Sequence, residues 1–593
     1  MDVSSPRTDA LSMEPSAKLF CCGFVRRCIP LVHREELYHI LRMTGPLLVC
    51  RFLNFLLFFV VTMFCGRMGN TVLAGYAMAS ATINVTAAAT GFGLALACDT
   101  LVSQTFGSKN LLRVGVILQR GILILTLFSL PCWALLLNTQ PLLLYLGQDP
   151  EVARIAQLYV VAYLPAIPAM FLYQLQLSYL QNQGVIKPQM YASAVANVAN
   201  VIVNYFLLYW WDYGVYGSAA ANTFAQVFNC FALFCFIRWQ RLYEKTWGGW
   251  SSEAFQDWGS YMKLAIPSTL MTCFEWWIYE VGGFLAGMLS EVDLAAQHVV
   301  IMLAYINYMI PLGLQGAACV RVGNALGAGE TAAAILTSKV SLISAAVIAI
   351  FQGFILGSTK TVIGYIFTSD EAIAELVSQL LNIYCPLQFF NGILGVGMGI
   401  LLGTGQQKIA AIANLFGYYC IGLPSSIVLM FTAKLQVAGF WLGLLIAVFL
   451  LAIFFIVAIF KLNWKKMTEE AIERTGKSAN GAITRSHRNS FYQVVLNPEN
   501  GNGYVVVGSH DQDEGLNSTV VHEGPNVTPV EEKPAVLLST TQLVLRRGLT
   551  SLAALLILAA GIAVHLIVPL PEVSYGAGTN STLDSNFTTA TPI

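Results

Sequence analysis

Long apolar runs separated by short polar loops follow one another along the chain as far as residue 461. A helix needs about 20 apolar residues to cross a bilayer, and the pattern predicts twelve such spans in two sets of six. The first set covers 38–65, 72–105, 113–137, 156–180, 189–211 and 215–238. The second covers 261–289, 294–325, 333–357, 373–402, 408–431 and 436–461. We therefore expect an all-α polytopic membrane protein with an N-lobe at 37–245 and a C-lobe at 246–463.

The segment at 91–110 is repeated at 311–330, where GFGLALACDTLVSQTFGSKN returns as PLGLQGAACVRVGNALGAGE. At an offset of 220 the identical pairs are Gly93/Gly313, Leu94/Leu314, Ala97/Ala317, Val102/Val322 and Gly107/Gly327. Because each set has an even number of spans, both sets enter the membrane from the same side, which predicts two parallel six-helix repeats. Substrate sites of transporters lie at the interface between such repeats, so the duplication indicates transport.

The composition changes after the twelfth span. Residues 464–545 are polar and show no periodicity, which predicts a disordered linker. Arg546 and Arg547 then precede a mainly apolar run that ends at Leu570, so we expect a thirteenth span at 546–570.

The loops predict the orientation of the chain in the membrane. Lys and Arg concentrate on the side of the N-terminal segment 1–36, which places that segment and the linker in the cytoplasm. With an odd number of spans, the tail at 571–593 lies outside the cell. Glycosylation is then expected at the sequons that begin at Asn580 and Asn586.

The composition excludes several classes of function. Charged residues make up only 11% of the chain, against roughly 25% in ordinary soluble domains. The net charge of zero with no basic stripe gives no reason to expect a nucleic-acid partner.

The thirteen cysteines lack metal-ligand spacing, so no metal site is expected. Cys65 and Cys132 fall near the outer ends of spans, and whether they pair stays open. Without a P-loop, an HExxH motif or a Ser-His-Asp arrangement, we expect neither an enzyme nor a cofactor.

The seventh predicted span carries two carboxylates on one face. A helix turns about 100° per residue, which places Tyr279 near 40°, Trp276 near 100° and Glu280 near 140° from Glu275. Intramembrane carboxylates are costly and mark functional sites, and aromatic faces attract cations. A site that exchanges a proton for an organic cation needs this combination, although a pair satisfied by neighbouring helices would also explain it.

Other polar positions inside spans allow two interpretations. Ser193, Asn197, Asn200 and Asn204 line one face of the fifth span, where they either face a wet cavity or join helices by hydrogen bonds.

Arg51 in the first span either partners Glu275 or Glu280, or binds an anionic group, or extends to the membrane surface. Asp99 and Arg321 occupy nearly equivalent repeat positions, and are expected either to pair in an inner gate or to have unrelated capping or interfacial roles.

Several motifs together resemble those of vertebrate multidrug and toxin extrusion (MATE) transporters of the kidney and liver type. They are INVTAAATGFGLALACDTLVSQTFGS, LQRG, PCWALLLNTQ, TWGGWS, LAIPS, CFEWWIYEVG, VRVGNALGAG, LNWKK and QLVLRRGL. The resemblance implies two six-helix lobes around a central cleft, an extra C-terminal span, and a plasma-membrane antiporter that exchanges protons for organic cations by alternating access. Its expected partners are those cations, protons and the lipid bilayer, and we expect it to act as a monomer.

The resemblance also assigns roles to residues. Glu275 and Glu280 match the family's two essential seventh-span glutamates. The other matching positions tied to transport are Trp276, Tyr279, Tyr308, Asn84, Cys65 and Cys132.

Four positions depart from the family pattern. Met302 and Asn391 stand where relatives have glutamates, Gln388 replaces a histidine, and Arg51 replaces a glutamine. These departures leave two alternatives to an organic cation antiporter, namely a transporter of the same fold for zwitterionic or anionic substrates, or a lipid flippase.

Overall fold

The computed structural model describes residues 30–368, 370–476 and 538–567, and all regular structure in these ranges is helical. The first six-helix set comprises α2 (Leu31–Met68), α3 (Asn70–Ile83), η2 (Asn84–Ala88), α4 (Ala89–Gly107), α5 (Leu111–Leu136), α6 (Thr139–Tyr145), α7 (Pro150–Tyr163), α8 (Ala166–Gln181), α9 (Lys187–Tyr205), η3 (Phe206–Trp210) and α10 (Gly214–Trp239). The second comprises η4 (Ser252–Phe255), α11 (Trp258–Gly287), α12 (Glu291–Ala328), α13 (Thr331–Ile363), η5 (Gly364–Ile366), α14 (Glu371–Thr404), α15 (Gln407–Asn414), η6 (Leu415–Gly422), α16 (Leu423–Ile427), η7 (Val428–Thr432) and α17 (Gln436–Lys461). Two further helices follow, α18 (Trp464–Arg474) and α20 (Thr540–Ile567).

Eleven of these helices or helix runs are long and apolar enough to cross a membrane, and the pair α7–α8 forms a twelfth bent span. The pair bends by 56°, where the sequence predicts one span at 156–180. Pro165 lies at this break, and proline lacks the N–H that a continuous helix needs. Helix α11 completes the two sets of six; at 30 residues it is about 45 Å long, and Glu275 and Glu280 lower its hydropathy. The predicted fold class is confirmed.

Each of the two lobes has its own large hydrophobic core. The first is built mainly from α2 to α10 and the second mainly from α11 to α17. Helix α11 belongs to both, since Tyr261 lies in the first core and Met271 in the second. Helix α2 also changes partner along its length: Leu47 packs in the second core and Val61 in the first. These two helices therefore couple the lobes.

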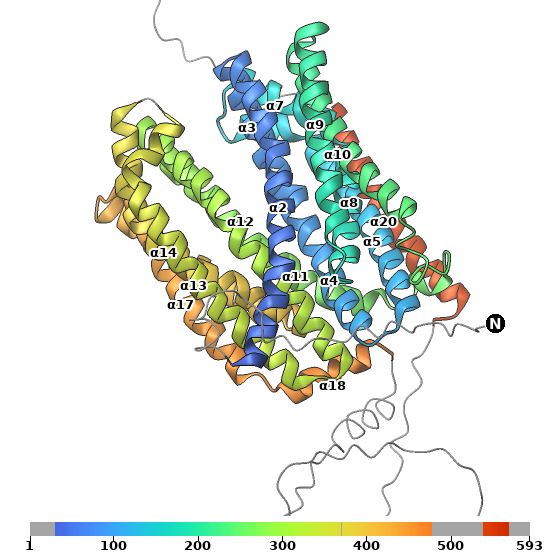
Figure 1. The fold of residues 1–593 in the computed structure, drawn as a ribbon. Coiled ribbons are helices and arrows are strands. Elements are labelled where there is room, and N and C mark those ends of the chain that lie inside the picture. The colour runs from blue at the N-terminus through green and yellow to red at the C-terminus, as the bar shows by residue number, and fades with distance from the viewer. Residues whose placement is uncertain (1–29, 369, 477–537, 568–593) are drawn as a thin grey trace, which may run out of the picture.

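The two lobes touch at one end and diverge toward the other (Figure 1). We call the touching end the closed end; it is where α4 ends at Gly107, α12 ends at Ala328, and α18 lies. Helix α2 begins at this end with Leu31 and runs toward the end where the lobes are apart (Figure 1).

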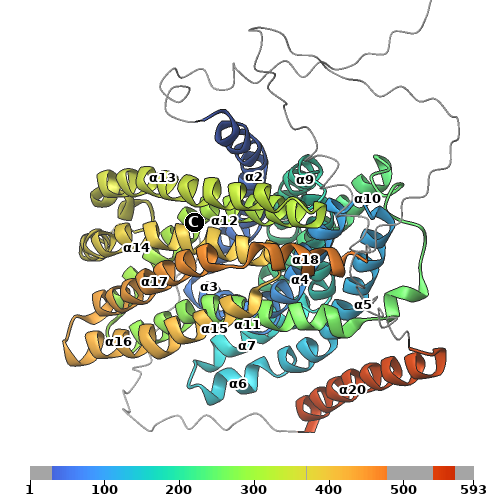
Figure 2. The same ribbon diagram turned by 90° about the horizontal axis from the view of Figure 1, so that it is seen from below.

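Helix α20 lies at the edge of the molecule beside α5 of the first lobe (Figure 2). The Asn138 Nδ2 donates to the Gly561 carbonyl at 3.0 Å, and Gly561 approaches Ala134 so closely that a Cβ at 561 would lie 2.6 Å from the Ala134 Cβ. At its other end the Arg547 guanidinium lies 4.2 Å from the ring centre of Trp258. The predicted thirteenth helix is therefore present, although it begins at Thr540 rather than at 546. The tail with Asn580 and Asn586 lies outside the described residues.

The start of the predicted linker is wrong, because residues 464–474 form α18. The Asn463 Oδ1 accepts from the Lys466 amide at 3.2 Å and caps the helix. Met467 and Ala471 are four residues apart and both are buried in the second core. A short amphipathic helix with one buried face reads as polar sequence when only its overall composition is considered. Residues 477–537 of the linker lie outside the described part of the chain.

Candidate functional site

The carboxylate of Glu275 is buried between helices of the second lobe. Its residue is 8% exposed, and its Oε1 accepts a hydrogen bond from the Tyr308 hydroxyl of α12 at 2.9 Å. Tyr308 Oη in turn lies close to Gly395 of α14, where a Cβ would be 3.0 Å away. The tyrosine therefore fixes the carboxylate at the point where α11, α12 and α14 meet.

The second carboxylate, Glu280, faces the first lobe. Its Oε1 accepts from the Asn84 Nδ2 at 3.1 Å. Asn84 is the first residue of the π-helical segment η2, and such segments occur often at functional sites. One turn earlier on α11, Trp276 stacks on Phe92 of α4 with ring centres 5.4 Å apart. The acidic face of α11 thus contacts the first lobe through an amide and an aromatic ring.

A cavity of about 50 Å³ opens beside Glu275. It is lined by Glu275, Trp276, Tyr279, Ile301, Ala304, Tyr305, Tyr308, Tyr384 and Asn391. One water needs roughly 10–15 Å³ of such space, so the cavity admits a few water molecules in this conformation. Its wall combines one carboxylate with five aromatic side chains, and none of these nine residues is basic.

All nine lining residues belong to the second repeat, from 275 to 391. The sequence predicts a site at the interface between the repeats. From the first repeat, Asn84 bonds to Glu280 and Phe92 stacks on Trp276, and neither lines the cavity. Tyr305 and Tyr384 are lining residues that the sequence interpretation missed. The sequence could have predicted Tyr305, because Ile301, Tyr305 and Tyr308 share one helix face at spacings of four and three residues.

Three predicted site residues take up distinct positions. Asn391 lines the cavity. Gln388, one turn earlier on α14, instead donates from Nε2 to the Ala349 carbonyl of α13 at 2.7 Å and joins these two helices. Arg51 is half-buried on α2, is not among the lining residues, and forms no ion pair with either glutamate in the described chain.

The duplicated segments meet each other at the closed end. A Cβ on Gly107 would collide with the backbone of Asn324, and a Cβ on Gly327 would collide with the backbone of Gln104. Positions 104 and 324 differ by 220, as positions 107 and 327 do, so the two contacts are equivalent under the duplication. Helices α4 and α12 can approach this closely because both positions are glycine, and the close approach brings the two lobes together.

An ion pair beside this crossing corrects the predicted Asp99–Arg321 pair. The Arg321 guanidinium binds Glu36 of α2 with both Nε and Nη2 at 2.5 Å. Thr337 of α13 donates to the same carboxylate at 2.6 Å. Asp99 accepts from the Asn182 Nδ2 at 2.7 Å within the first lobe. Arg321 thus pairs with a residue of α2 and not with the repeat-related residue of α4, which repeat equivalence alone does not reveal.

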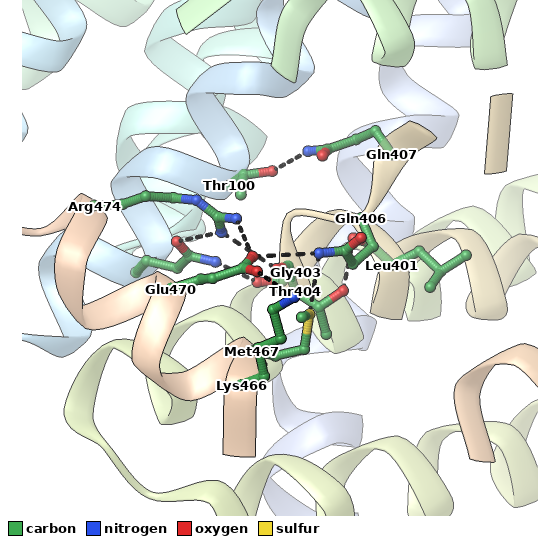
Figure 3. A network of polar contacts seen from close by, with 11 residues as sticks. Thr100, Leu401, Gly403, Thr404, Gln406, Gln407, Lys466, Met467, Glu470 and Arg474 are labelled. Carbon is green, nitrogen blue, oxygen red and sulfur yellow. Dashed lines mark hydrogen bonds and ion pairs between the residues drawn. The ribbon is translucent and has the colours of Figure 1, made fainter. Parts of the chain in front are cut away.

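Helix α18 forms hydrogen bonds with helices of both lobes at the closed end (Figure 3). The Arg474 Nη1 donates to the Gln104 Oε1 of α4 at 3.4 Å and to the Thr404 carbonyl of α14 at 3.3 Å, while Nη2 donates to Glu470 at 2.9 Å. The Gln104 Nε2 donates to the Gly403 carbonyl at 2.9 Å. Burial lowers the pKa of the Arg474 guanidinium, and the Glu470 carboxylate opposes this shift. One arginine of α18 therefore contacts both lobes.

Comparisons with known proteins agree with this architecture. The MatE family model matches residues 46–206 and 267–428. The chain belongs to the MatE family. It is 45% identical over 575 residues to multidrug and toxin extrusion protein 1 of Danio rerio, covering 95% of this chain and 96% of that protein. The identity to the Homo sapiens protein of the same name is 45%, covering 91% and 95% of the two chains. The crystal structure of the eukaryotic MATE transporter AtDTX14 superposes with a TM-score of 0.72 at 27% identity and covers 75% of this chain and 99% of that one.

The MatE match also supports the duplication. Its two segments begin at 46 and 267, 221 residues apart, which is close to the offset of 220 between the repeated motifs. As a MatE protein the chain is a multi-pass membrane transporter rather than an enzyme, in line with the extrusion proteins that it resembles.

Two open questions about this MatE chain are settled by its contacts. The polar stripe of the fifth predicted span joins helices, since Asn197 and Asn200 of α9 donate to the Leu53 and Leu57 carbonyls of α2 at 2.7 and 3.1 Å. Cys65 and Cys132 are free buried thiols, and the Cys65 Sγ lies 3.1 Å from the Tyr159 hydroxyl.

Proposed function

We propose that this protein is a secondary transporter that exchanges protons for organic cations. The observation that carries the proposal is the pair Glu275 and Glu280 on one face of α11, each held by a single neutral hydrogen-bond donor. Within the described residues neither carboxylate has a basic partner, so a proton or a cationic substrate is needed to neutralise it. Competition between these two for the same carboxylates couples their movements.

The cavity wall supports a cation rather than an anion. Trp276, Tyr279, Tyr305 and Tyr384 surround the space beside Glu275, and aromatic faces attract organic cations. The absence of a basic side chain among the nine lining residues gives an anionic group no partner there. Arg51 lies outside this wall, so we do not extend the proposal to anionic or zwitterionic substrates.

Transport would proceed by alternating access of the two lobes. In the conformation described, the lobes touch at the closed end and diverge at the other (Figure 1). We place the closed end on the cytoplasmic side, because the loops there carry most of the Lys and Arg residues. The N-terminus is then cytoplasmic and the C-terminus extracellular in the plasma membrane, and the lobes diverge toward the outer side.

The test uses initial rates of uptake of a labelled organic cation into proteoliposomes, with and without a pH gradient. We expect Glu275→Gln and Glu280→Gln each to abolish the response to the gradient, because neither amide can carry the coupled proton. Glu151→Gln is the matched control, since Glu151 is exposed and pairs with Arg154 at 2.6 Å on the surface. Uptake that responds normally to pH in both α11 variants would disprove the proposal.

A further inference from the structure

The Asn391 amide is a buried polar group without a protein partner. Asn391 is 7% exposed and lines the cavity, and its Oδ1 forms no hydrogen bond. Within the described part of the chain no other residue bonds to its side chain. By contrast, the exposed Asn382 on the same helix accepts from Lys360 at 2.6 Å. Buried amides are normally satisfied, and among the described buried amide oxygens that have no partner, that of Asn391 belongs to a residue of the cavity wall, where a ligand can reach it.

The neighbouring groups define what that ligand must supply. Glu275 offers a carboxylate of which Oε1 is engaged by Tyr308, and Tyr279 and Tyr305 offer aromatic faces in the same wall. A quaternary ammonium satisfies the carboxylate and the rings, because both respond to charge alone. It has no N–H, and it therefore leaves the Asn391 acceptor unpaired while displacing any water that bonded to it.

We propose that Asn391 selects organic cations that carry N–H donors, such as protonated amines, amidines and guanidines, over quaternary ammonium ions of similar shape. The proposal rests on the proposed function, since it assumes that the cavity beside Glu275 receives the cationic substrate. In the bound state the charge lies against Glu275 and the aromatic rings, while an N–H donates to the Asn391 side-chain oxygen. Leaving a buried acceptor unpaired is costly, so we expect a preference of about tenfold in affinity.

The test compares protonated N,N-dimethylbenzylamine with benzyltrimethylammonium, which differ by one methyl group in place of the N–H. Their dissociation constants are measured by titration calorimetry on the purified full-length protein at pH 7. Hydration also differs between the two ions, so the informative quantity is the change in their affinity ratio between wild type and variant. Asn391→Leu, which has a similar volume and no hydrogen-bonding group, should reduce the preference for the N–H cation about tenfold, or about 1.4 kcal/mol.

Two further variants keep the test decisive. Asn382→Leu removes an exposed amide of α14 and should leave the ratio unchanged. Asn391→Asp keeps an oxygen acceptor of the same shape and should retain the preference for the N–H cation, even if Asn391→Leu folds poorly. An affinity ratio that is the same in wild type and Asn391→Leu, or a loss of preference in Asn391→Asp, would overturn the proposal, as would a wild type that binds neither ion.

The same samples separate this inference from the proposed function. If both ions bind with the expected ratios but proteoliposomes show no proton-coupled uptake, the antiport mechanism fails while the role of Asn391 stands. If coupled uptake is normal but the ratio is insensitive to Asn391, the antiport mechanism stands while the selectivity role fails.

Discussion

Replacing Arg321 by glutamine is expected to open the closed end. The substitution removes the two hydrogen bonds that Arg321 donates to Glu36, at 2.5 Å each, and leaves the carboxylate with Thr337. Glu36 lies on α2 and Arg321 on α12, beside the crossing of α4 and α12. The lost contacts join the start of α2 to α12 beside this crossing, so we expect the substitution to destabilise the closed arrangement more than the open one.

The size of the effect follows from the burial of the two side chains. A hydrogen bond to a charged group contributes about 1.5–3 kcal/mol, and breaking a fully buried ion pair costs about 3–5 kcal/mol. The Arg321 and Glu36 side chains are 29% and 10% exposed, so water screens the pair in part. We expect the closed arrangement to lose about 2 kcal/mol of stability. The population of molecules in which the lobes have separated at this end then rises about 30-fold.

A cysteine at Ser103 measures that population. Ser103 is fully buried at the crossing, where a Cβ on Gly323 would collide with it, and Ser103→Cys changes one atom. We expect the rate of maleimide labelling at this position, followed by mass spectrometry, to rise about 30-fold in Arg321→Gln. The control is Arg154→Gln, which breaks an ion pair whose side chains are 54% and 53% exposed and should change the rate less than twofold.

Restoring the pair with reversed charges should slow the labelling again. Glu36→Arg combined with Arg321→Glu recovers the opposite charges but not the Thr337 bond, so we expect partial recovery. An unchanged rate in Arg321→Gln, or an equal rise in Arg154→Gln, would refute the assignment of this pair to the closed end.

Two further predictions concern glycines at helix contacts. Gly327→Ala and Gly107→Ala should each separate α4 from α12 and raise the rate of maleimide labelling at position 103. Gly357→Ala, where a Cβ meets nothing within 4 Å, should leave the rate unchanged, and equal labelling in all three variants would contradict the crossing. Gly561→Leu should detach α20 from α5. After cleavage at a protease site placed within 477–537, the fragment with α20 should then no longer co-purify with the fragment that carries the two lobes. Gly548→Leu, which also has open space, should leave α20 attached, and co-purification of both variants would argue against this docking site.

Periodicity predicted the parts of the site that lie on one helix. The 100° rotation per residue is enough to place Glu275 and Glu280 on a common face of α11 with Trp276. The same reasoning could not separate Asn391 from Gln388, which are three residues apart on α14 and so share a side of the helix. One lines the cavity and the other bonds to α13, because the outcome depends on which neighbouring helix each side chain meets.

Contacts between segments far apart in the chain could not be predicted from the sequence. Glu36 and Arg321 are 285 residues apart, and the duplication directed attention to Asp99 because it is the repeat counterpart of that region. Helix α18 was missed for a different reason, since two buried apolar side chains, Met467 and Ala471, in eleven residues do not raise the average hydropathy. The thirteen spans were predictable because each must bury a long apolar surface in the bilayer, whatever its neighbours are.

The duplication divides the molecule into a symmetric part and an asymmetric part. Where the repeats stayed alike, at Gly107 and Gly327, they form two equivalent contacts that close one end. Where they diverged, the second repeat alone supplies the nine residues of the cavity wall. A symmetric crossing suits a gate, because equivalent contacts on both sides of the axis break together when the lobes move apart. An asymmetric wall suits the proposed exchange, because Glu275 in that wall and Glu280 on the same helix would then carry either the proton or the cation on one lobe through that movement.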